Sequence, residues 1–550
     1  MYRTVNRLIG VYQKQLDTAY QKDFEDPRKQ QLKVFERIRK LTQGCESARI
    51  AGLEGVSSYA DFRKQGRVTL YQDYAELVHQ IIHVENKTGL FTNTPIECMG
   101  MTSGTTDTEK LIPFQQAYRN EYMLTTNAWY GCIRKRRPNA LKGKVFYSVL
   151  PKFRGEAYHT GLRRITMGGY NFRNIPRPMQ KALYACPKEV LETITDKSRL
   201  MPVLLAQVFS SNVTLYADLL PQGCMNFFMD LFTYGDEVLY YLKNGKPSFT
   251  VPKALEPVLH LKPDRRALDR VHQVLKEGAI TDLSDLLPGI DTIIVWKGSY
   301  AGIFLDRLKQ IIPPKVQIWD GLYSATEGWF NYTNDPDRAG GPVAIKSHFL
   351  EFRDAEDESA DILPVWELED QNKYEVFVTN SAGLIRYRMK DVVKVDGFER
   401  NTPRICFDDK YGDYLTFQWE RVTASQIELL VDKLIAVLGL DFRRFSYYGM
   451  GIYPEHDLPF FVLFLETDYQ PTDFSGFDAH QELGDMTFMY QESIDYKLID
   501  KMRLCLVPKG TYQREIVKKE NLNMTQVKYN RIVRDPVFIQ KWVKHAFIGE

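Results

Sequence analysis

The chain has 550 residues, of which 44% are hydrophobic and 13% aromatic, and its 72 Lys and Arg nearly balance 70 Asp and Glu. A chain of this length is too long to fold around one hydrophobic core, so we predict two or three domains. The net charge of +2 provides no field that would favour a nucleic-acid or membrane-surface protein. The densest basic cluster, IRKRRP at 133–138, is interpreted as a solvated helix end. We therefore expect a globular protein with neither nucleic-acid nor membrane partners.

The cysteine pattern indicates a reducing compartment. Seven cysteines are scattered along the chain without a C-x-x-C pair or a histidine at metal-ligand spacing, which argues against a disulfide frame and a zinc site. Residues 1–16 lack the continuous apolar core of a signal peptide. The most apolar stretch, residues 201–220, is interrupted by polar side chains and predicts a buried helix rather than a membrane span. We expect a cytoplasmic protein.

Along the chain, the pattern of apolar residues changes from helical to mixed. Residues 1–90 repeat apolar positions at intervals of three and four, which predicts helices. Later, short apolar runs rich in β-branched and aromatic residues alternate with helical or turn segments, which is typical of an α/β sheet. These runs lie at 144–150, 292–298, 315–324 and 373–380.

A second, smaller domain is expected near the C-terminus. Residues 397–412 are dense in charge, Pro and Gly and are interpreted as a linker. Beyond them, a helix is predicted with Thr423 as its cap and Gly439 as its stop. Strands are expected at 443–453 and 458–466, and a second helix at 490–504. We predict an α/β fold in which a large N-terminal domain (1–405, helical over 1–90) is hinged at 406–412 to a small α+β domain (413–550).

The segment CMGMTSGTTDTEKLIPF, residues 98–114, places five Ser or Thr hydroxyls and two glycines around a single lysine. It does not fit the nucleotide signature G-x-x-x-x-G-K-[ST], because only Gly104 lies near Lys110 and no Ser or Thr follows that lysine. Either a different kind of phosphate loop or an ordinary turn would explain it.

Two later segments carry side chains suited to a nucleotide. In WDGLYSATEGWF, residues 319–330, Tyr323 offers an aromatic face for a base and Glu327 a carboxylate able to hold Mg²⁺. Small residues between them allow the backbone to pass close to a ligand. In AGLIRYRMKDVVKV, residues 382–395, Asp391 follows Arg388, and a carboxylate at a strand end can accept both hydrogen bonds of a ribose diol.

In this order, TSGTT…K, YSATEG and YR..D resemble the three-motif signature of the acyl-adenylate-forming superfamily, which includes acyl-CoA synthetases, luciferases and peptide-synthetase adenylation domains. The match is finer to one branch, the acyl acid-amido synthetases first known as auxin-responsive Gretchen Hagen proteins, with their bacterial relatives. YEVFVTNSAGLIRYRMKDVVKVDGF resembles that branch before its hinge, and VPKGTYQREI with MTQVKYNRIV resembles its tail. The resemblance runs from about residue 90 to the end.

This resemblance implies an ATP- and Mg²⁺-dependent ligase that adenylates a small carboxylic acid to acyl-AMP and then transfers the acyl group to an amine, such as an amino acid. It implies that Ser103, Gly104, Thr105, Thr106 and Lys110 meet the ATP phosphates. It implies that the nucleoside and metal are held by Tyr323 on adenine, Asp391 on ribose, Glu327 on Mg²⁺, and Ser324, Ala325, Thr326 and Arg388 beside them. Lys528, from the small domain, would reach the site in one half-reaction.

The acid-binding residues and the acceptor are less constrained. Candidate walls of the acid site are Tyr158, His159, Phe209 and Ser210, although His159 also fits a loop histidine and Phe209 also fits the core. Transfer to a thiol of coenzyme A or of a carrier protein remains an alternative to transfer to an amine. A nucleotide-binding regulator without turnover is the third possibility, because Asp107 and Glu109 stand where relatives commonly have Gly and Pro.

Overall fold

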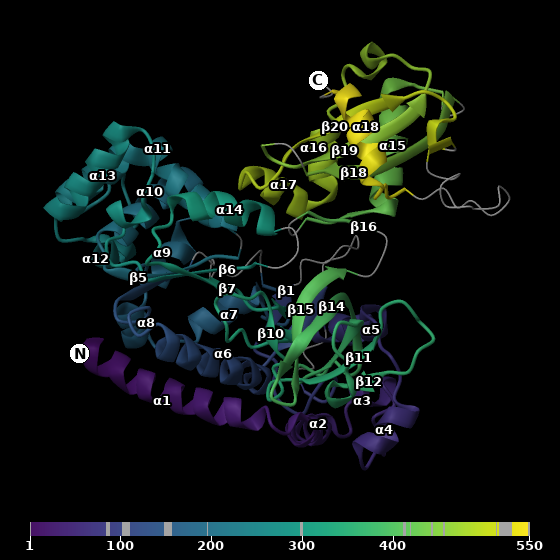
Figure 1. Cartoon of the computed structure of the whole chain (residues 1–550), viewed down its shortest axis with the longest axis horizontal. Coiled ribbons are helices and arrows are strands. Elements are labelled where there is room, and N and C mark those ends of the chain that lie inside the picture. The colour runs from purple at the N-terminus through teal and green to yellow at the C-terminus, as the bar shows by residue number, and fades with distance from the viewer. Residues whose placement is uncertain are drawn as a thin grey trace. The chain divides into compact units, whose positions relative to one another are not determined.

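The computed structural model describes the chain in segments: 2–83, 88–101, 110–147, 157–194, 196–219, 221–297, 301–410, 414–417, 420–441, 444–454, 457–512, 514–515 and 531–547. It divides into two compact units (Figure 1). The large unit comprises Met1–Thr102 and Lys110–Tyr411, and the small unit includes Gly412–Glu550.

Helices fill the N-terminal part of the large unit, as predicted for residues 1–90. Asp26 caps α2 by accepting a hydrogen bond from the Lys29 amide, and Ser58 caps α4 in the same way through the Asp61 amide. The helices of the unit are α1 (Tyr2–Asp23), α2 (Pro27–Thr42), α3 (Glu46–Ile50), α4 (Tyr59–Gln65), α5 (Tyr71–His83), α6 (Gln116–Arg136), α7 (Met167–Arg173), α8 (Arg177–Leu183), α9 (Lys188–Thr193), α10 (Lys197–Phe209), α11 (Pro221–Asn244), α12 (Glu256–Leu259), α13 (Arg265–Glu277) and α14 (Ala301–Ile311). The basic cluster at 133–138 includes the last turn of α6, which confirms the helix-end interpretation.

A parallel sheet of order β3-β5-β6-β7 lies in the middle of the unit. Its strands are β3 (Lys144–Tyr147), β5 (Val213–Ala217), β6 (Thr292–Val295) and β7 (Gln317–Asp320). Ile293 packs into one core cluster with α10, α11 and α13, whereas its neighbour Ile294 packs into the other cluster with α6. Both faces are therefore covered, as Figure 1 shows, and this explains why the strands are apolar throughout rather than alternating.

An antiparallel six-stranded sheet of order β10-β15-β14-β13-β11-β12 completes the large unit together with two smaller sheets. Its strands are β10 (Gly341–Pro342), β11 (Phe349–Asp354), β12 (Leu363–Pro364), β13 (Lys373–Thr379), β14 (Tyr387–Glu399) and β15 (Thr402–Lys410). The smaller sheets join β1 (Cys98–Met101) to β2 (Leu111–Phe114) and β4 (Arg164–Ile165), and β8 (Ser324–Ala325) to β9 (Gly328–Trp329). The linker predicted at 397–412 is wrong for 397–410, because these residues form the β14–β15 hairpin.

The small unit is an α+β module. Its mixed sheet has the order β18-β19-β20-β21, and a second sheet pairs β16 with β17. Thr423 forms a capping box at the start of α15, and Gly439 ends that helix in the left-handed region at φ 62°, so both predicted helix boundaries are confirmed. Its elements are β16 (Tyr414–Leu415), β17 (Val422–Thr423), α15 (Ala424–Leu438), β18 (Phe445–Tyr453), β19 (Phe460–Thr467), α16 (Ala479–Met486), α17 (Phe488–Asp495), β20 (Asp500–Val507), α18 (Pro536–Trp542) and β21 (Ala546–Phe547).

Two predicted helices end earlier than expected, and each is followed by a strand. The helix predicted at 490–504 stops at Asp495, and residues from Asp500 onward pair with β19 as β20. The helix predicted at 201–220 stops at Phe209, and the β-branched segment after it pairs with β3 as β5. In both cases pairing with a distant strand decides the conformation, which local periodicity does not reveal. No helix among the described residues is long and apolar enough to cross a membrane.

Candidate active site

The first motif is bracketed by two buried strands. β1 and β2 run antiparallel, and Met101 lies opposite Leu111. Ser103, Gly104, Thr105 and Thr106 lie outside the described residues, so their predicted contact with phosphates stays a prediction. Lys110, directly before β2, places its Nζ 5.9 Å from the centroid of the Tyr71 ring. The hydroxyl of the same tyrosine accepts a hydrogen bond from the Leu111 amide at 3.0 Å, which fixes the position at which the chain enters β2.

The second motif folds into a tight hairpin that contacts the first. Ala325 pairs with Gly328 across the β8–β9 turn, so Thr326 and Glu327 form its tip. Thr326 Oγ1 donates a hydrogen bond to the carbonyl of Met101 at 2.8 Å. Met101 ends β1, directly before the first motif. The structure therefore brings the hairpin tip to the end of that strand, although 225 residues separate the two positions in sequence.

The third motif meets the second through one buried hydrogen bond. The Tyr323 hydroxyl donates to Asp391 Oδ2 at 2.8 Å, and only 6% of Tyr323 and 3% of Asp391 are exposed. The Tyr323 ring stacks on Phe330 at a centroid distance of 4.5 Å and is tilted against Phe407 at 5.6 Å. The amide of Tyr323 also donates to Asn331 Oδ1 at 2.9 Å. The aromatic residue and the carboxylate predicted to hold a nucleoside thus lie side by side.

Glu327 is a mostly buried carboxylate among buried phenols. Eight per cent of the residue is exposed, and its carbonyl accepts a hydrogen bond from Asn380 Nδ2 at 2.7 Å. Burial raises the pKa of both Tyr118 and Tyr387, and the charge of Glu327 raises each further. The two phenols therefore stay protonated beside this carboxylate.

Whether this region suits a magnesium ion can be judged from its donors. Among the described residues, no group of three or more His, Cys, Asp or Glu side chains could hold a metal ion. A single buried carboxylate fits Mg²⁺ that arrives with a nucleotide, because Mg²⁺ commonly takes one or two protein carboxylates and fills its shell with phosphate oxygens and water. The donor set suits magnesium triphosphate better than a resident metal.

Asp320, at the end of β7, was not singled out by sequence reasoning. Its Oδ1 accepts the Lys297 amide and its Oδ2 accepts the Gly340 amide, both at 2.7 Å. Burial raises the pKa of Asp320 to about 7, and the two backbone hydrogen bonds and Lys297 lower it only partly. The side chain thereby ties the strand that precedes the second motif to two distant loops.

Arg388 of β14 makes ion pairs with Glu375 of β13 and with Glu358, which lies in the loop between β11 and β12. Its Nε lies 2.5 Å from Glu375 Oε1, and its Nη2 lies 2.7 Å from Glu358 Oε1. The guanidinium of Arg388 is therefore held by two carboxylates of the large unit. Its predicted contact with a nucleotide stays a prediction.

The residues predicted to bind the acid fall in two places. Tyr158 is half-buried in a turn closed by its carbonyl and the Gly161 amide, with the Arg164 guanidinium 5.7 Å from its ring centroid, and His159 is exposed. Phe209 is 1% exposed and belongs to the core cluster of α10, α11 and α13, and Ser210 caps the end of α10. The structure does not bring these two pairs together by any described contact, and their role stays a prediction. Lys528 lies outside the described residues.

Sequence reasoning missed a polar face of α6 that lies under the second motif. The Tyr118 hydroxyl donates to the carbonyl of Thr326 at 2.7 Å, and Glu121 is buried with 4% exposed. Their spacing of three residues places them on one face of the helix. In the sequence alone, such polar positions are indistinguishable from a solvated helix face.

The fold is that of solved acyl acid amido synthetases, a class of ligases. The structure titled "AtGH3.15 acyl acid amido synthetase in complex with 2,4-DB" superposes with a TM-score of 0.67 at 16% identity, covering 98% of this chain and 97% of that chain. Among curated proteins, the jasmonoyl–L-amino acid synthetase JAR4 of Nicotiana attenuata is 22% identical over 89% of this chain and 88% of its own length. The indole-3-acetic acid-amido synthetase GH3.3 of Arabidopsis thaliana is 21% identical over 80% of this chain and 78% of its own length.

Residues 18–317 match the GH3 family N-terminal domain, and residues 341–410 match the GH3 family central domain. The chain belongs to the GH3 family of acyl acid-amido synthetases and is a ligase of that kind. The family predicted from the three motifs and the tail is confirmed.

Proposed function

We propose that this protein activates a small carboxylic acid with ATP and Mg²⁺ to give acyl-AMP and pyrophosphate, and then transfers the acyl group to an amine, namely an amino acid. The observation that carries the proposal is the meeting of the motifs around Tyr323 and Asp391, with Thr326 bound to the end of β1. Membership of the GH3 family supports the amine as acceptor.

In the first half-reaction, an oxygen of the substrate carboxylate forms a bond to the α-phosphorus of ATP, and the bond from that phosphorus to pyrophosphate breaks. Both reactants are anions, so the charge on the departing pyrophosphate must be neutralised. Mg²⁺ supplies that neutralisation when bound with the nucleotide. We assign Glu327 to the metal, Lys110 and the first motif to the phosphates, and Tyr323 with Asp391 to the nucleoside.

In the second half-reaction, the amine nitrogen attacks the acyl carbon, the bond to the AMP oxygen breaks, and a proton leaves the nitrogen. The acyl-AMP must be shielded from water between the two steps. We assign this shielding to the small domain (413–550), with its hinge to the large domain placed after β15, at 411–412, and with Lys528 acting in one half-reaction only.

The test is acid-dependent exchange between ATP and radiolabelled pyrophosphate, measured over a panel of carboxylic acids with and without Mg²⁺. We expect exchange with at least one acid and none without the metal. Exchange with no acid, in a protein that still binds ATP, would contradict the proposal and favour a regulator that has lost turnover.

The acceptor is tested separately once an acid is known. Hydroxylamine should give an acyl hydroxamate, and amino acids should compete with it for the acyl group. More effective competition by coenzyme A than by any amino acid would contradict the amide-forming proposal and leave the adenylation step standing.

A further inference from the structure

One face of α6 is polar and almost completely buried. Glu121 is 4% exposed and Thr125 is 0% exposed. Gln115, the residue before the helix, is also 0% exposed, and its Nε2 donates to the carbonyl of Ser381. Burying polar groups is costly unless each finds a partner, and here the partners come from distant segments on both sides of the helix in sequence, among them Arg37, Ser347 and Ser381.

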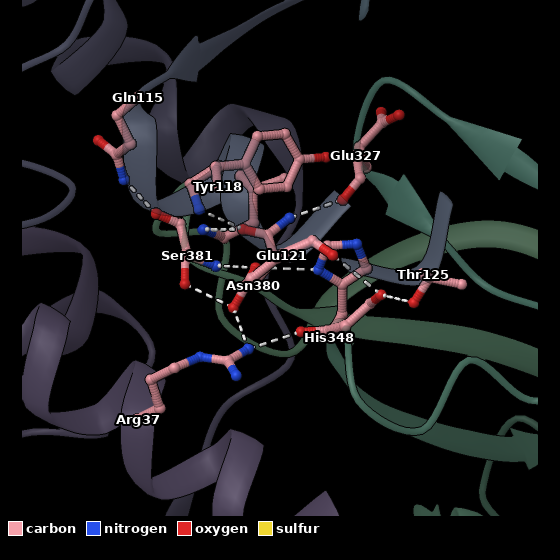
Figure 2. Close-up of polar contacts among 12 residues, drawn as sticks. Arg37, Gln115, Tyr118, Glu121, Thr125, Glu327, His348, Asn380 and Ser381 are labelled. Carbon is pink, nitrogen blue, oxygen red and sulfur yellow. Dashed lines mark hydrogen bonds and ion pairs between the residues drawn. The ribbon is translucent and has the colours of Figure 1, made fainter. Parts of the chain in front are cut away.

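Glu121 is the centre of this buried network. Its Oε1 accepts Arg37 Nη2 at 2.6 Å and Ser381 Oγ at 2.5 Å, and its Oε2 accepts the Ser381 amide at 3.0 Å. His348 Nδ1 lies 3.1 Å from the same Oε2. Burial raises the pKa of Glu121, but the hydrogen bond and charge of His348 and the charge of Arg37 outweigh it, so the pKa stays below its usual value. The carboxylate is therefore ionised, and Nδ1 of the imidazole carries the proton that faces it. Figure 2 shows these side chains converging on Glu121.

His348 lies directly beneath the hairpin of the second motif. The residue is fully buried, and its Nε2 has no hydrogen-bond partner among the described residues. A Cβ at Gly328 would lie 2.9 Å from His348 Cδ2 and 3.1 Å from its Nε2, so the imidazole packs against the backbone next to Glu327. This close approach explains why the position after Glu327 is glycine.

The network also supports the residue that donates a hydrogen bond to the backbone carbonyl of Glu327. Asn380, whose Nδ2 donates to the Glu327 carbonyl, is followed by Ser381, which donates to Glu121 through both its amide and its hydroxyl. Tyr118, one turn before Glu121 on α6, donates to the carbonyl of Thr326. The hairpin is therefore contacted by Tyr118, Asn380 and His348. Tyr118 belongs to α6, and the other two are linked to α6 through Glu121 (Figure 2).

We propose that Glu121 and His348 are positioning residues for Glu327: they fix the hairpin tip through Gly328 and through Asn380–Ser381, and so set the metal-binding carboxylate for adenylation. This inference rests on the proposed function. Neither side chain touches the reacting atoms. Because Glu327 is assigned to the first half-reaction, the pair should matter for adenylation far more than for amide formation.

The test compares E121Q and H348N with D17N in the full chain. A Gln at 121 keeps the size of the side chain but replaces one acceptor oxygen by a donor, which must face either the Ser381 amide or the Arg37 guanidinium. Asp17 is a matched control, because it is a fully buried carboxylate that pairs with Lys135 of α6 at 2.6 Å and none of its described contacts is to the hairpin tip. All three variants remove or disturb a buried polar interaction of the same helix.

We expect E121Q and H348N to lower acid-dependent pyrophosphate exchange about tenfold or more, the usual range for groups that orient a metal-binding residue, and to raise the Mg²⁺ concentration needed for half-maximal exchange. Amide formation from supplied acyl-AMP should fall less than about threefold, and D17N should change both half-reactions equally. Equal loss of both half-reactions in E121Q and H348N, or unchanged exchange in folded protein, would overturn the proposal.

A second readout does not depend on turnover. The rise in melting temperature caused by ATP with Mg²⁺, compared with ATP and EDTA, reports whether the metal–nucleotide complex is held. E121Q and H348N should lose most of the Mg²⁺-dependent part of that rise, whereas D17N should keep it. If the wild type shows this rise but no exchange, the proposed function fails, and the rise still tests the positioning role. A full Mg²⁺-dependent rise in E121Q would refute the positioning role.

Discussion

Replacing Tyr323 with Phe removes one hydroxyl and keeps the ring on Phe330, so it tests the contact between the second and third motifs. The lost hydrogen bond is 2.8 Å long and ends on the buried carboxylate of Asp391. Hydrogen bonds to charged groups contribute about 1.5–3 kcal/mol, so we expect Y323F to lower the free energy of unfolding by about 2 kcal/mol. A carboxylate that has lost its orienting donor should also hold ATP less well, and a loss of about 1.4 kcal/mol would raise KM for ATP about tenfold.

The assay is a double-mutant cycle of Y323F and D391N. Each variant is measured by urea unfolding of the large unit and by its KM for ATP. Side chains in direct contact show coupling of about 0.5–3 kcal/mol. The control is Y374F, because Tyr374 is also buried and its hydroxyl accepts hydrogen bonds from the Glu369 amide at 3.1 Å and from Asn372 Nδ2 at 3.4 Å. Y374F should destabilise the protein without changing KM. Additive effects of Y323F and D391N, with KM unchanged, would refute the reasoning.

Three further predictions concern other parts of the chain. Burial raises the pKa of Asp320 from its ordinary value of 3.8 to about 7, so the folded state binds the proton more tightly, and the free energy of unfolding should fall by about 3 kcal/mol as pH rises from 4 to 7. Urea unfolding at several pH values should show that D320N lacks this slope, and an identical slope in the variant would contradict the prediction. K528A should slow one half-reaction far more than the other in separate assays of exchange and amide formation, and uniform loss would count against a mobile small domain. Glu466 accepts the amides of Gly510 and Tyr512 at 2.8 and 2.7 Å, so E466Q should speed hydrogen exchange of those two amides by lowering the stability of that loop by about 2 kcal/mol, and unchanged exchange would refute this.

Local sequence signals predicted the boundaries that depend on local interactions. Thr423 and Gly439 bound α15 as expected, because a capping box and a left-handed glycine act over a few residues. The linker predicted at 397–412 is wrong over 397–410 for the opposite reason. Its charged and polar residues find partners far away in sequence: Arg404, for example, is 3% exposed and its Nη1 donates to Asn334 Oδ1 at 2.7 Å. Composition does not reveal such partners.

The same division holds for the candidate site. The contact between Tyr323 and Asp391 could be predicted, because the types and order of the motif residues are tied to nucleotide chemistry, whereas the roles of Tyr323, Glu327 and Asp391 toward a nucleotide stay predictions. The supporting network could not, because Glu121 and His348 are ordinary residues of a helix and a strand end until Ser381 and Gly328 are placed against them. Supporting residues are defined by tertiary contacts, and one sequence does not contain those explicitly.

The most direct test of the central claim is to trap the intermediate. The purified protein, mixed with ATP, Mg²⁺ and an accepted acid but no amine, is quenched in acid and analysed by mass spectrometry. The account predicts acyl-AMP at close to one equivalent per active site in the wild type and none above background in E327A or D391A, with both variants still folded. Acyl-AMP formed at the wild-type level by either variant, or AMP released from the wild type without any acyl-AMP, would contradict the claim that these motifs form one adenylating site.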